Sequence, residues 1–319
     1  MNKYFDPKKY IINLSLRLST IISIWEKWKI EKYSKLSLKH QPVFIIGAPR
    51  TGSTILYQVL TNQLDVLYID NLTCIFSKNF FYGFWLSNKL FGQNAHNNFK
   101  SYHGNTAQYG LRAPGECGGY WYKWLPKDHH FIDYDEITDE MVHEIRREIT
   151  AVTNYFDKPI IFKNLNAGQR IRLLTRCFPN AKFIFITRDK LMTAQSILLS
   201  RRKLGINEKE FWSIKPKNFE QLSKLSTTKQ IVQQIYYLEK QIVEDQRLVK
   251  QNNFRKINYE ELSSGSLMKN VKKFVGAVPR KDAVSFEIKT NNKIALTKAE
   301  IAEFRRLIDE LDWKTYGLS

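Results

Sequence analysis

The sequence is poor in cysteine and contains no long hydrophobic run. Its 319 residues include three cysteines, Cys74, Cys117 and Cys177, which lie far apart along the chain. Three isolated cysteines argue against a disulfide framework or a zinc site, and they favour a reducing compartment. No segment reaches the ~18 uninterrupted apolar residues of a membrane-spanning helix. We therefore expect a cytoplasmic protein, with any membrane association limited to the surface.

Acidic residues are also scarce relative to basic ones. The chain has 31 Asp and Glu against 50 Lys and Arg, a formal net charge of +19. Such a charge attracts anionic lipid, nucleic acid or a multiply charged nucleotide, unless most of it is simply solvated. The hydrophobic content of 43% and the aromatic content of 13% exclude a disordered chain.

The N-terminal residues 1–41 form a basic segment with helical periodicity. Apolar residues between Tyr10 and Trp25 recur at three- and four-residue steps, and lysines surround them. This pattern predicts an amphipathic helix that either docks on an anionic membrane or packs across the protein's own core. No small-residue cleavage site follows it, so we do not expect a secretion signal.

One stretch, Val43 to Leu60, contains an apolar run, a Gly-rich turn and a helix start. The spacing Gly47-x4-Gly52-Ser53-Thr54 is typical of a loop whose backbone N–H groups bind phosphate at a helix N-terminus. The lysine of nucleotide-hydrolysing P-loops is replaced by Ser53, and Arg50 supplies a cation instead. The loop therefore indicates a phosphate-bearing donor whose reactive group is not the usual γ-phosphoryl.

A second segment, Lys182 to Arg202, has the same strand-to-helix character and carries Arg188 and Ser196. Together with the run Pro49-Arg50-Thr51-Gly52-Ser53-Thr54, it resembles the sulfotransferases that use 3′-phosphoadenosine 5′-phosphosulfate (PAPS). The segment Phe211–Pro216 resembles the bacterial, carbohydrate-type branch of these enzymes more than the cytosolic branch that acts on phenols and steroids. The resemblance implies that residues 42–319 form a sulfotransferase domain, that PAPS is the donor, and that 3′-phosphoadenosine 5′-phosphate is the product.

The apolar patterning predicts the fold independently. Strands are expected at 43–46, 66–69, 158–162, 182–187 and 254–258, and helices at 53–64, 76–90, 138–156 and 217–251, with a capping box at Thr297–Glu300 before a terminal helix. Alternating strands and helices predict an α/β fold of three layers, with a central, mostly parallel sheet like that of P-loop NTPases. Ligands of such folds bind at the carboxyl ends of the strands.

The resemblance assigns roles to individual residues. It implies that the loop holds the 5′-phosphate, that Arg188 and Ser196 hold the 3′-phosphate, and that either Tyr259 or the segment Arg280-Lys281 lies near the adenine. The donor-binding residues are thus expected to be Arg50, Thr51, Gly52, Ser53, Thr54, Arg188, Ser196 and Tyr259. No metal site is expected.

Three residues are candidates for the chemical step. Arg50 and Lys163 are positively charged and could neutralise the negative charge that develops on the bridging oxygen of the donor as it leaves. Lys163 begins the run Lys163-Asn164-Leu165. In the cytosolic members of the family that this sequence resembles, the corresponding run is Lys-Thr-His and its histidine is the catalytic base, which is absent here. Because other branches use a glutamate, Glu116 is the expected base, unless it pairs with Arg112 or lies in solvent. Other candidate bases are His96, His103, His129 and His130.

Three functions follow from these patterns. The first is sulfuryl transfer to an acceptor hydroxyl, such as that of a glycan or lipid precursor. The second is a P-loop kinase of small metabolites, which would need the missing lysine and a carboxylate for Mg²⁺. The third is a basic nucleic-acid- or membrane-binding module, which leaves the anion loops unexplained. We expect the first, with no nucleic-acid partner.

Overall fold

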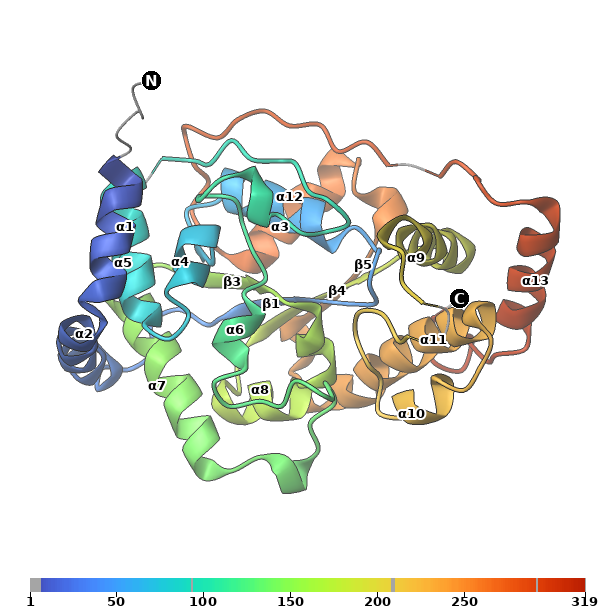
Figure 1. Ribbon diagram of the computed structural model, residues 1–319, viewed down its shortest axis with the longest axis horizontal. Coiled ribbons are helices and arrows are strands. Elements are labelled where there is room, and N and C mark those ends of the chain that lie inside the picture. Colours follow the sequence, from blue (N-terminus) through green and yellow to red (C-terminus); the bar gives the residue numbers. More distant parts are fainter. Residues whose placement is uncertain (1–6, 93, 208–209, 291, 319) are drawn as a thin grey trace.

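The computed structural model describes residues 7–92, 94–207, 210–290 and 292–318 (Figure 1). Its five strands are β1 (Val43–Ile46), β2 (Leu67–Tyr68), β3 (Ile160–Lys163), β4 (Lys182–Thr187) and β5 (Phe254–Asn258). The helices before β3 are α1 (Pro7–Arg17), α2 (Ser19–Ser34), α3 (Ser53–Gln63), α4 (Asn71–Ile75), α5 (Phe80–Phe91), α6 (Gly118–Trp121) and α7 (Asp139–Phe156). Those after it are α8 (Ile171–Cys177), α9 (Lys190–Leu204), α10 (Phe219–Leu222), α11 (Thr227–Asp245), α12 (Gly265–Val275) and α13 (Lys298–Asp309).

The five strands form one sheet in the order β2-β3-β1-β4-β5. Every pairing between them is parallel. The predicted α/β fold with a central parallel sheet is therefore confirmed, and within the described residues the sheet is entirely parallel rather than mostly so. All four residues of β1 are fully buried, as expected of a central strand covered on both faces.

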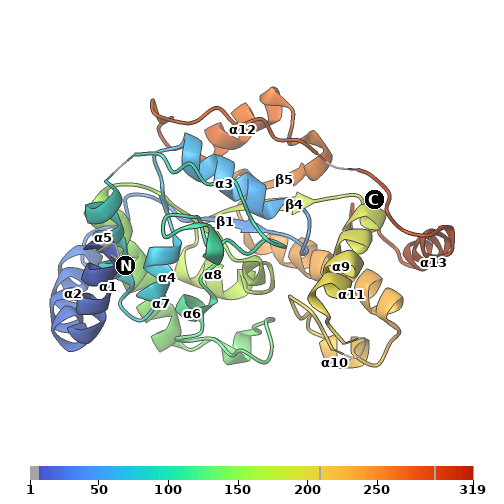
Figure 2. The ribbon, with the colours of Figure 1, turned by 45° about the horizontal axis from the view of Figure 1, so that its top comes forward.

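Helices cover both faces of the sheet, which gives the three predicted layers (Figure 2). Side chains alternate along β1, so Val43 and Ile45 pack in one core with α3 and α12. Phe44 and Ile46 point the other way, into a larger core shared with α7, α8 and α11. The helices α1 and α2 lie at one end of the molecule, beside α5 and α7.

The N-terminal segment contains two helices where one was expected. The chain turns at Leu18, although hydrogen bonds from Leu18 N to Leu14 O and from Ile22 N to Leu18 O keep the backbone nearly continuous. The end of α2 is tied to α7 by Asn154, whose side-chain amide donates to three carbonyls of residues 33–37. The division of the chain at residue 41 stays a prediction.

Two other predictions of secondary structure need correction. The single helix expected over 217–251 is broken into α10 and α11, because the serines between them favour caps and turns over helix interiors. The strand expected at 66–69 contains only the two residues of β2. In contrast, Thr138 caps α7 by accepting from Met141 N, and the capping box of Thr297 and Glu300 begins α13 as predicted.

The sheet order brings the predicted functional segments together. The loop after β1 lies between the ends of β3 and β4, and β5 follows next to β4. Because all these strands are parallel, their carboxyl ends meet at one edge. Lys163, Arg188 and Tyr259, which end or follow β3, β4 and β5, therefore lie at the same edge as the Gly-rich loop.

Candidate functional site

The loop after β1 is fitted closely to its neighbours. Gly47 has φ 153°, and a Cβ there would lie 2.4 Å from the carbonyl oxygen of Ile186 on β4. Gly52 has φ 88°, and a Cβ there would lie 2.3 Å from the ring of Tyr259. Only glycine fits both places, so β4 and the segment after β5 shape the loop as much as its own sequence does.

The loop ends at the N-terminus of α3, which begins at Ser53. The first N–H groups of a helix have no intrahelical acceptor and suit an anion. Ser53 and Thr54 line the cavity in front of them. Thr51 does not, because its hydroxyl donates to Ala48 O at 2.8 Å and its side chain is fully buried. Of the predicted loop residues, Thr51 is thus placed to act through its backbone alone.

Two arginines converge beside the loop. Arg188 donates from Nη1 to the carbonyl oxygen of Arg50 at 3.3 Å, and its guanidinium lies 4.3 Å above the ring of Tyr259. Arg50 donates from Nε to Ser196 Oγ at 3.0 Å. Burial and the like charge of Arg188 together lower the pKa of Arg50. Within the described ranges Arg50 makes no ion pair with a carboxylate, so this part of the cavity attracts anions.

The other predicted catalytic residues meet across the same cavity. Lys163, at the end of β3, forms an ion pair with Glu116 in the loop before α6. The lysine side chain is only 3% exposed, whereas the glutamate is 44% exposed. Asn164 donates to the backbone carbonyl of Glu116 at 3.3 Å and fixes that loop to the sheet. Glu116 therefore reaches the cavity with a cation beside it, which the sequence did not indicate.

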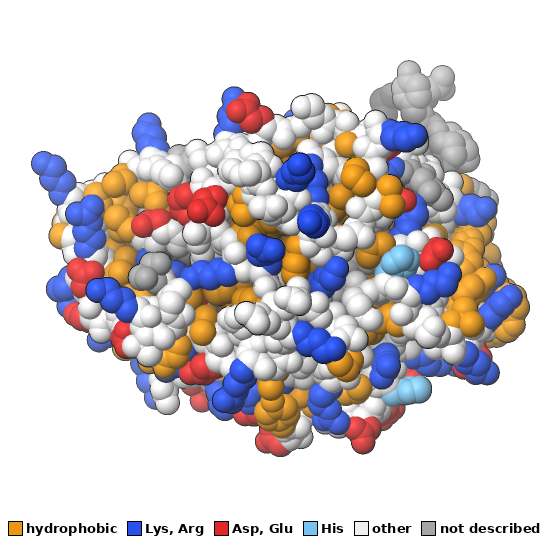
Figure 3. Space-filling model, turned by 180° about the vertical axis from the view of Figure 1, so that it is seen from behind, with side chains coloured by type: hydrophobic (Ala, Val, Ile, Leu, Met, Phe, Trp, Pro, Cys, Tyr) orange, Lys and Arg blue, Asp and Glu red, His pale blue; other side chains and the backbone are white. Residues whose placement is uncertain are grey.

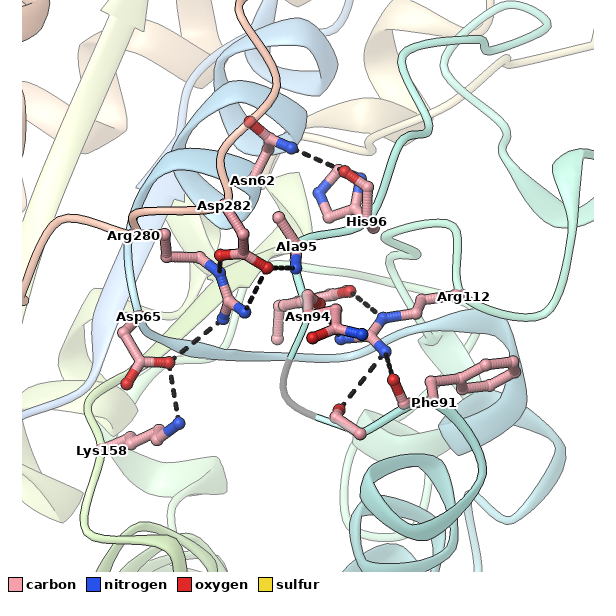
Figure 4. A network of polar contacts seen from close by, with 12 residues as sticks. Asn62, Asp65, Phe91, Asn94, Ala95, His96, Arg112, Lys158, Arg280 and Asp282 are labelled. Atoms are coloured by element: carbon pink, nitrogen blue, oxygen red, sulfur yellow. Dashed lines mark hydrogen bonds and ion pairs between the residues drawn. The ribbon is translucent and has the colours of Figure 1, made fainter.

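The alternative partner of Glu116, Arg112, is held elsewhere. Its guanidinium donates to the carbonyl oxygens of Phe91 and Asn94 (Figure 4). In the same network Arg280 binds Asp65 and Asp282, and Asp282 accepts from Ala95 N at 2.6 Å. These contacts tie the irregular segment after α5 to α3 and to the segment after α12. Neither arginine lines the cavity, so the network supports the site from outside.

Two of the four candidate histidines line the cavity, namely His103 and His130. His103 Nδ1 lies 2.9 Å from Ser200 Oγ, and burial and the charge of Arg50 lower its pKa. His130 Nδ1 accepts from Lys215 N at 2.8 Å, and burial lowers its pKa to about 4. His96 and His129 lie away from the cavity, bound to Thr61 and Glu136.

The cavity has a volume of about 510 Å³ and is lined by two chemically different sets of residues. One set consists of Pro49, Arg50, residues 52–55, Arg188 and Tyr259, and the other of Glu116, Tyr122, Leu165, Asn166, Trp212 and Ile214. A second cavity of about 390 Å³ adjoins it and shares its lining at His103, Gly104, Glu116, Trp212 and Ser213. Of the aromatic run 120–124, Tyr122 lines the main cavity, and Tyr120 and Trp121 belong to the core.

A parallel α/β sheet with a Gly-rich loop and two neighbouring arginines at its carboxyl edge has the features of a site that suits anionic ligands. The model of the sulfotransferase family matches residues 42–269, more than half of the chain. The chain therefore belongs to the sulfotransferase family and is a transferase of that kind. A comparison with curated proteins gave no match.

Two solved structures are similar over most of the chain. Sulfotransferase STF9 from Mycobacterium avium is 14% identical, with a TM-score of 0.51, over 97% of this chain and 79% of that one. Sulfotransferase STF1 from Mycobacterium tuberculosis H37Rv is 12% identical, also with a TM-score of 0.51, over 91% of this chain and 81% of that one. At such low identity the likeness shows the shared fold and leaves the donor and acceptor open.

Proposed function

We propose that this sulfotransferase moves a sulfuryl group from PAPS to the hydroxyl of an acceptor, such as a glycan or lipid precursor. The observation that carries the proposal is the pair Arg50 and Arg188 at the N-terminus of α3. Two neighbouring guanidiniums, one of them without a carboxylate partner in the described part of the chain, suit a ligand with several phosphate or sulfate groups.

The donor has two separate anionic parts, and the loop and Arg188 suit one each. The N–H groups at the start of α3 and the hydroxyls of Ser53 and Thr54 bind the 5′-phosphate. Arg188 binds the 3′-phosphate through charge-assisted hydrogen bonds, with Ser196 beside it. Tyr259, already stacked under Arg188, is close enough to the loop to contact the nucleoside.

The chemical step is an in-line displacement. The acceptor oxygen bonds to sulfur while the bond from sulfur to the bridging phosphate oxygen breaks, and the bisphosphate leaves. Arg50 and Lys163 stabilise the negative charge that develops on the bridging oxygen and the sulfuryl group. Glu116 accepts the proton of the acceptor hydroxyl, and Lys163 holds the carboxylate in position for it.

The acceptor fits the part of the cavity that is lined by aromatic and neutral polar side chains. Tyr122 and Trp212 offer aromatic faces, and Asn166 offers an amide. The adjoining cavity adds the neutral polar side chains of Asn71, Asn105 and Thr106. A mixture of rings and neutral hydrogen-bonding groups suits a hydroxylated acceptor with little charge.

Calorimetry with 3′-phosphoadenosine 5′-phosphate tests the donor. We expect binding that is independent of Mg²⁺ and stronger than that of ATP, since Ser53 stands where kinases have lysine. The variant Arg188→Gln should bind the bisphosphate about 10- to 100-fold more weakly, the usual worth of charged hydrogen bonds. Tighter, Mg²⁺-dependent binding of ATP would instead favour a kinase.

Transfer from labelled PAPS to a panel of hydroxyl acceptors tests the rest. In the presence of an accepted substrate, Glu116→Gln should lower turnover by about 10²- to 10⁴-fold, the usual contribution of a general base. The variants His103→Gln and His130→Gln are the matched comparisons, since both histidines line the same cavity. If Glu116→Gln retains full turnover while one histidine variant loses it, the base is that histidine.

A further inference from the structure

The two N-terminal helices expose a row of large apolar side chains. We call it the N-terminal apolar stripe and define it as Ile11, Leu14, Leu18, Ile21, Ile24 and Trp28. Ile21, Ile24 and Trp28 recur at three- and four-residue steps along α2, so they share one side of that helix, and Ile11 and Leu14 are three residues apart on α1. Ile21 is 64% exposed, Ile24 67% and Trp28 57%, which is unusual for side chains of this size. Several exposed apolar side chains on one helix face indicate a binding face.

The stripe is not needed to attach α2 to the rest of the protein, because other side chains of α2 do this. Trp25 makes edge contacts with Phe81, Tyr82 and Trp85 of α5, at centroid distances between 5.4 and 6.0 Å. Ile30 belongs to the main core. The helix therefore has two apolar sides, one packed inward and one facing solvent.

Positive charge accompanies the stripe. Residues 7–36 contain seven basic residues, namely Lys8, Lys9, Arg17, Lys27, Lys29, Lys32 and Lys35. Their two acidic residues are both engaged: Glu26 is buried, and Glu31 pairs with Lys35 at 2.6 Å. The ammonium groups of Lys29 and Lys32 lie 4.7 and 5.8 Å from the ring of Trp28. Figure 3 shows hydrophobic and basic side chains intermixed at the edge of the molecule where α1 and α2 lie.

We propose that the N-terminal apolar stripe docks this protein on the surface of an anionic phospholipid bilayer. An amphipathic helix of this kind lies in the interface, with its apolar side chains among the acyl chains and its lysines at the headgroups. The occupant must be negatively charged, because a second copy of this chain would bring two lysine-rich faces together. Within the described residues no helix is long and apolar enough to cross a membrane, so the contact is superficial.

Co-sedimentation with phosphatidylcholine vesicles, with and without phosphatidylserine, tests the proposal on the full chain. We expect binding that requires phosphatidylserine and weakens with added salt. The double variant Ile21→Ser, Ile24→Ser should bind at least about tenfold more weakly, since it removes two exposed apolar side chains. The matched control is Val278→Ser, Val284→Ser, because both valines are exposed but lie far along the chain, after α12. This control should bind as the parent does.

A second pair of variants tests the charge. Lys27→Gln, Lys32→Gln should weaken binding to phosphatidylserine vesicles about 30-fold, from the usual contribution of two lysines near an anionic surface. The same change on α12, Lys269→Gln, Lys273→Gln, lowers the net charge equally and should have little effect. Equal losses of vesicle affinity in the two double variants would mean that the overall charge, not the stripe, drives binding, and would overturn the proposal.

Two other results would also overturn it. One is absence of vesicle binding by the parent chain. The other is a dimer in solution, detected by light scattering, that Ile21→Ser, Ile24→Ser converts to a monomer, since the stripe would then bind a second copy. The proposal is independent of the sulfotransferase mechanism. Activity on an acceptor free in solution should be the same in the stripe variants and in the parent.

Discussion

The cavity and the helical core both bury charge, but they neutralise it differently. In the core, Lys190 at the start of α9 pairs with Glu239 of α11 at 2.6 Å, and the carboxylate is fully buried. In the cavity, Arg50 is mostly buried and has another arginine as its neighbour. A charge that the chain itself compensates serves the fold, whereas one left without a counter-charge among the described residues suits a charged ligand.

The largest expected effect breaks the compensated pair. In Lys190→Met, Glu239 keeps its burial, which raises its pKa, but loses the cation that partly offsets this rise. We expect the free energy of unfolding to fall by about 3–5 kcal/mol, as is usual when one partner of a buried pair is removed. Urea denaturation measures this change. The double variant Lys190→Met, Glu239→Leu should recover most of the lost stability. If it does not, the loss in Lys190→Met does not come from leaving Glu239 without its cation.

The matching change in the cavity should affect turnover instead of stability. Arg50→Gln removes the cation proposed to act on the leaving oxygen, so we expect turnover with PAPS to fall by about 10²- to 10³-fold. The free energy of unfolding should stay the same or rise, because a buried like charge beside Arg188 is lost. The control Arg305→Gln replaces an exposed arginine on α13. A loss of stability in Arg50→Gln as large as that in Lys190→Met would show that Arg50 serves the fold as Lys190 does, and would contradict the comparison.

A third test concerns Glu26, a buried charge compensated by hydrogen bonds. It accepts from Asn79 Nδ2 and Phe81 N, both at 2.7 Å, and from Tyr82 N at 3.2 Å, at the start of α5. Burial nevertheless raises its pKa to about 7, from an ordinary value of 4.5. The folded protein thus holds this proton more tightly than the unfolded chain does. Its contribution to stability is complete below about pH 4.5 and is lost as the pH rises through 7.

Glu26→Gln imitates the protonated carboxyl and should remove this pH dependence. Between pH 4.5 and 8 the free energy of unfolding of the variant should gain about 3 kcal/mol relative to that of the parent. Urea titrations of both proteins at four or five pH values measure the difference. Because parent and variant share all other titrating groups, the contributions of those groups cancel in the comparison. A constant difference across this range would mean that the hydrogen bonds at α5 keep Glu26 ionised.

The sequence predicted the surroundings of the Gly-rich loop better than the rest of the cavity, for a physical reason. The loop, its helix and Arg50 belong to one stretch, so local spacing determines their geometry. Arg188 and Tyr259 directly follow β4 and β5, and parallel strands bring such ends to one edge. These rules need no knowledge of long-range packing.

The rest of the cavity depends on contacts between distant and irregular segments. Glu116 meets Lys163 because Arg112 is occupied by backbone carbonyls and because Asn164 fixes the loop before α6. Trp212 comes from a segment without regular structure. His103 reaches the cavity on the segment after α5, which the Arg280 network holds in place. These contacts between distant segments leave no periodic pattern in the sequence, so sequence patterns could not predict them.

The smallest expected effect separates the two roles of Ser196. Its hydroxyl accepts from Arg50 Nε, yet the resemblance assigns it to the 3′-phosphate. If it binds the phosphate, Ser196→Ala should weaken the affinity for 3′-phosphoadenosine 5′-phosphate about fivefold, the worth of one hydrogen bond. If it only orients Arg50, affinity should stay constant while turnover falls. Calorimetry and single-turnover transfer on the same variant distinguish the two, with Ser266→Ala, which replaces an exposed serine that bonds Ser264 Oγ, as control.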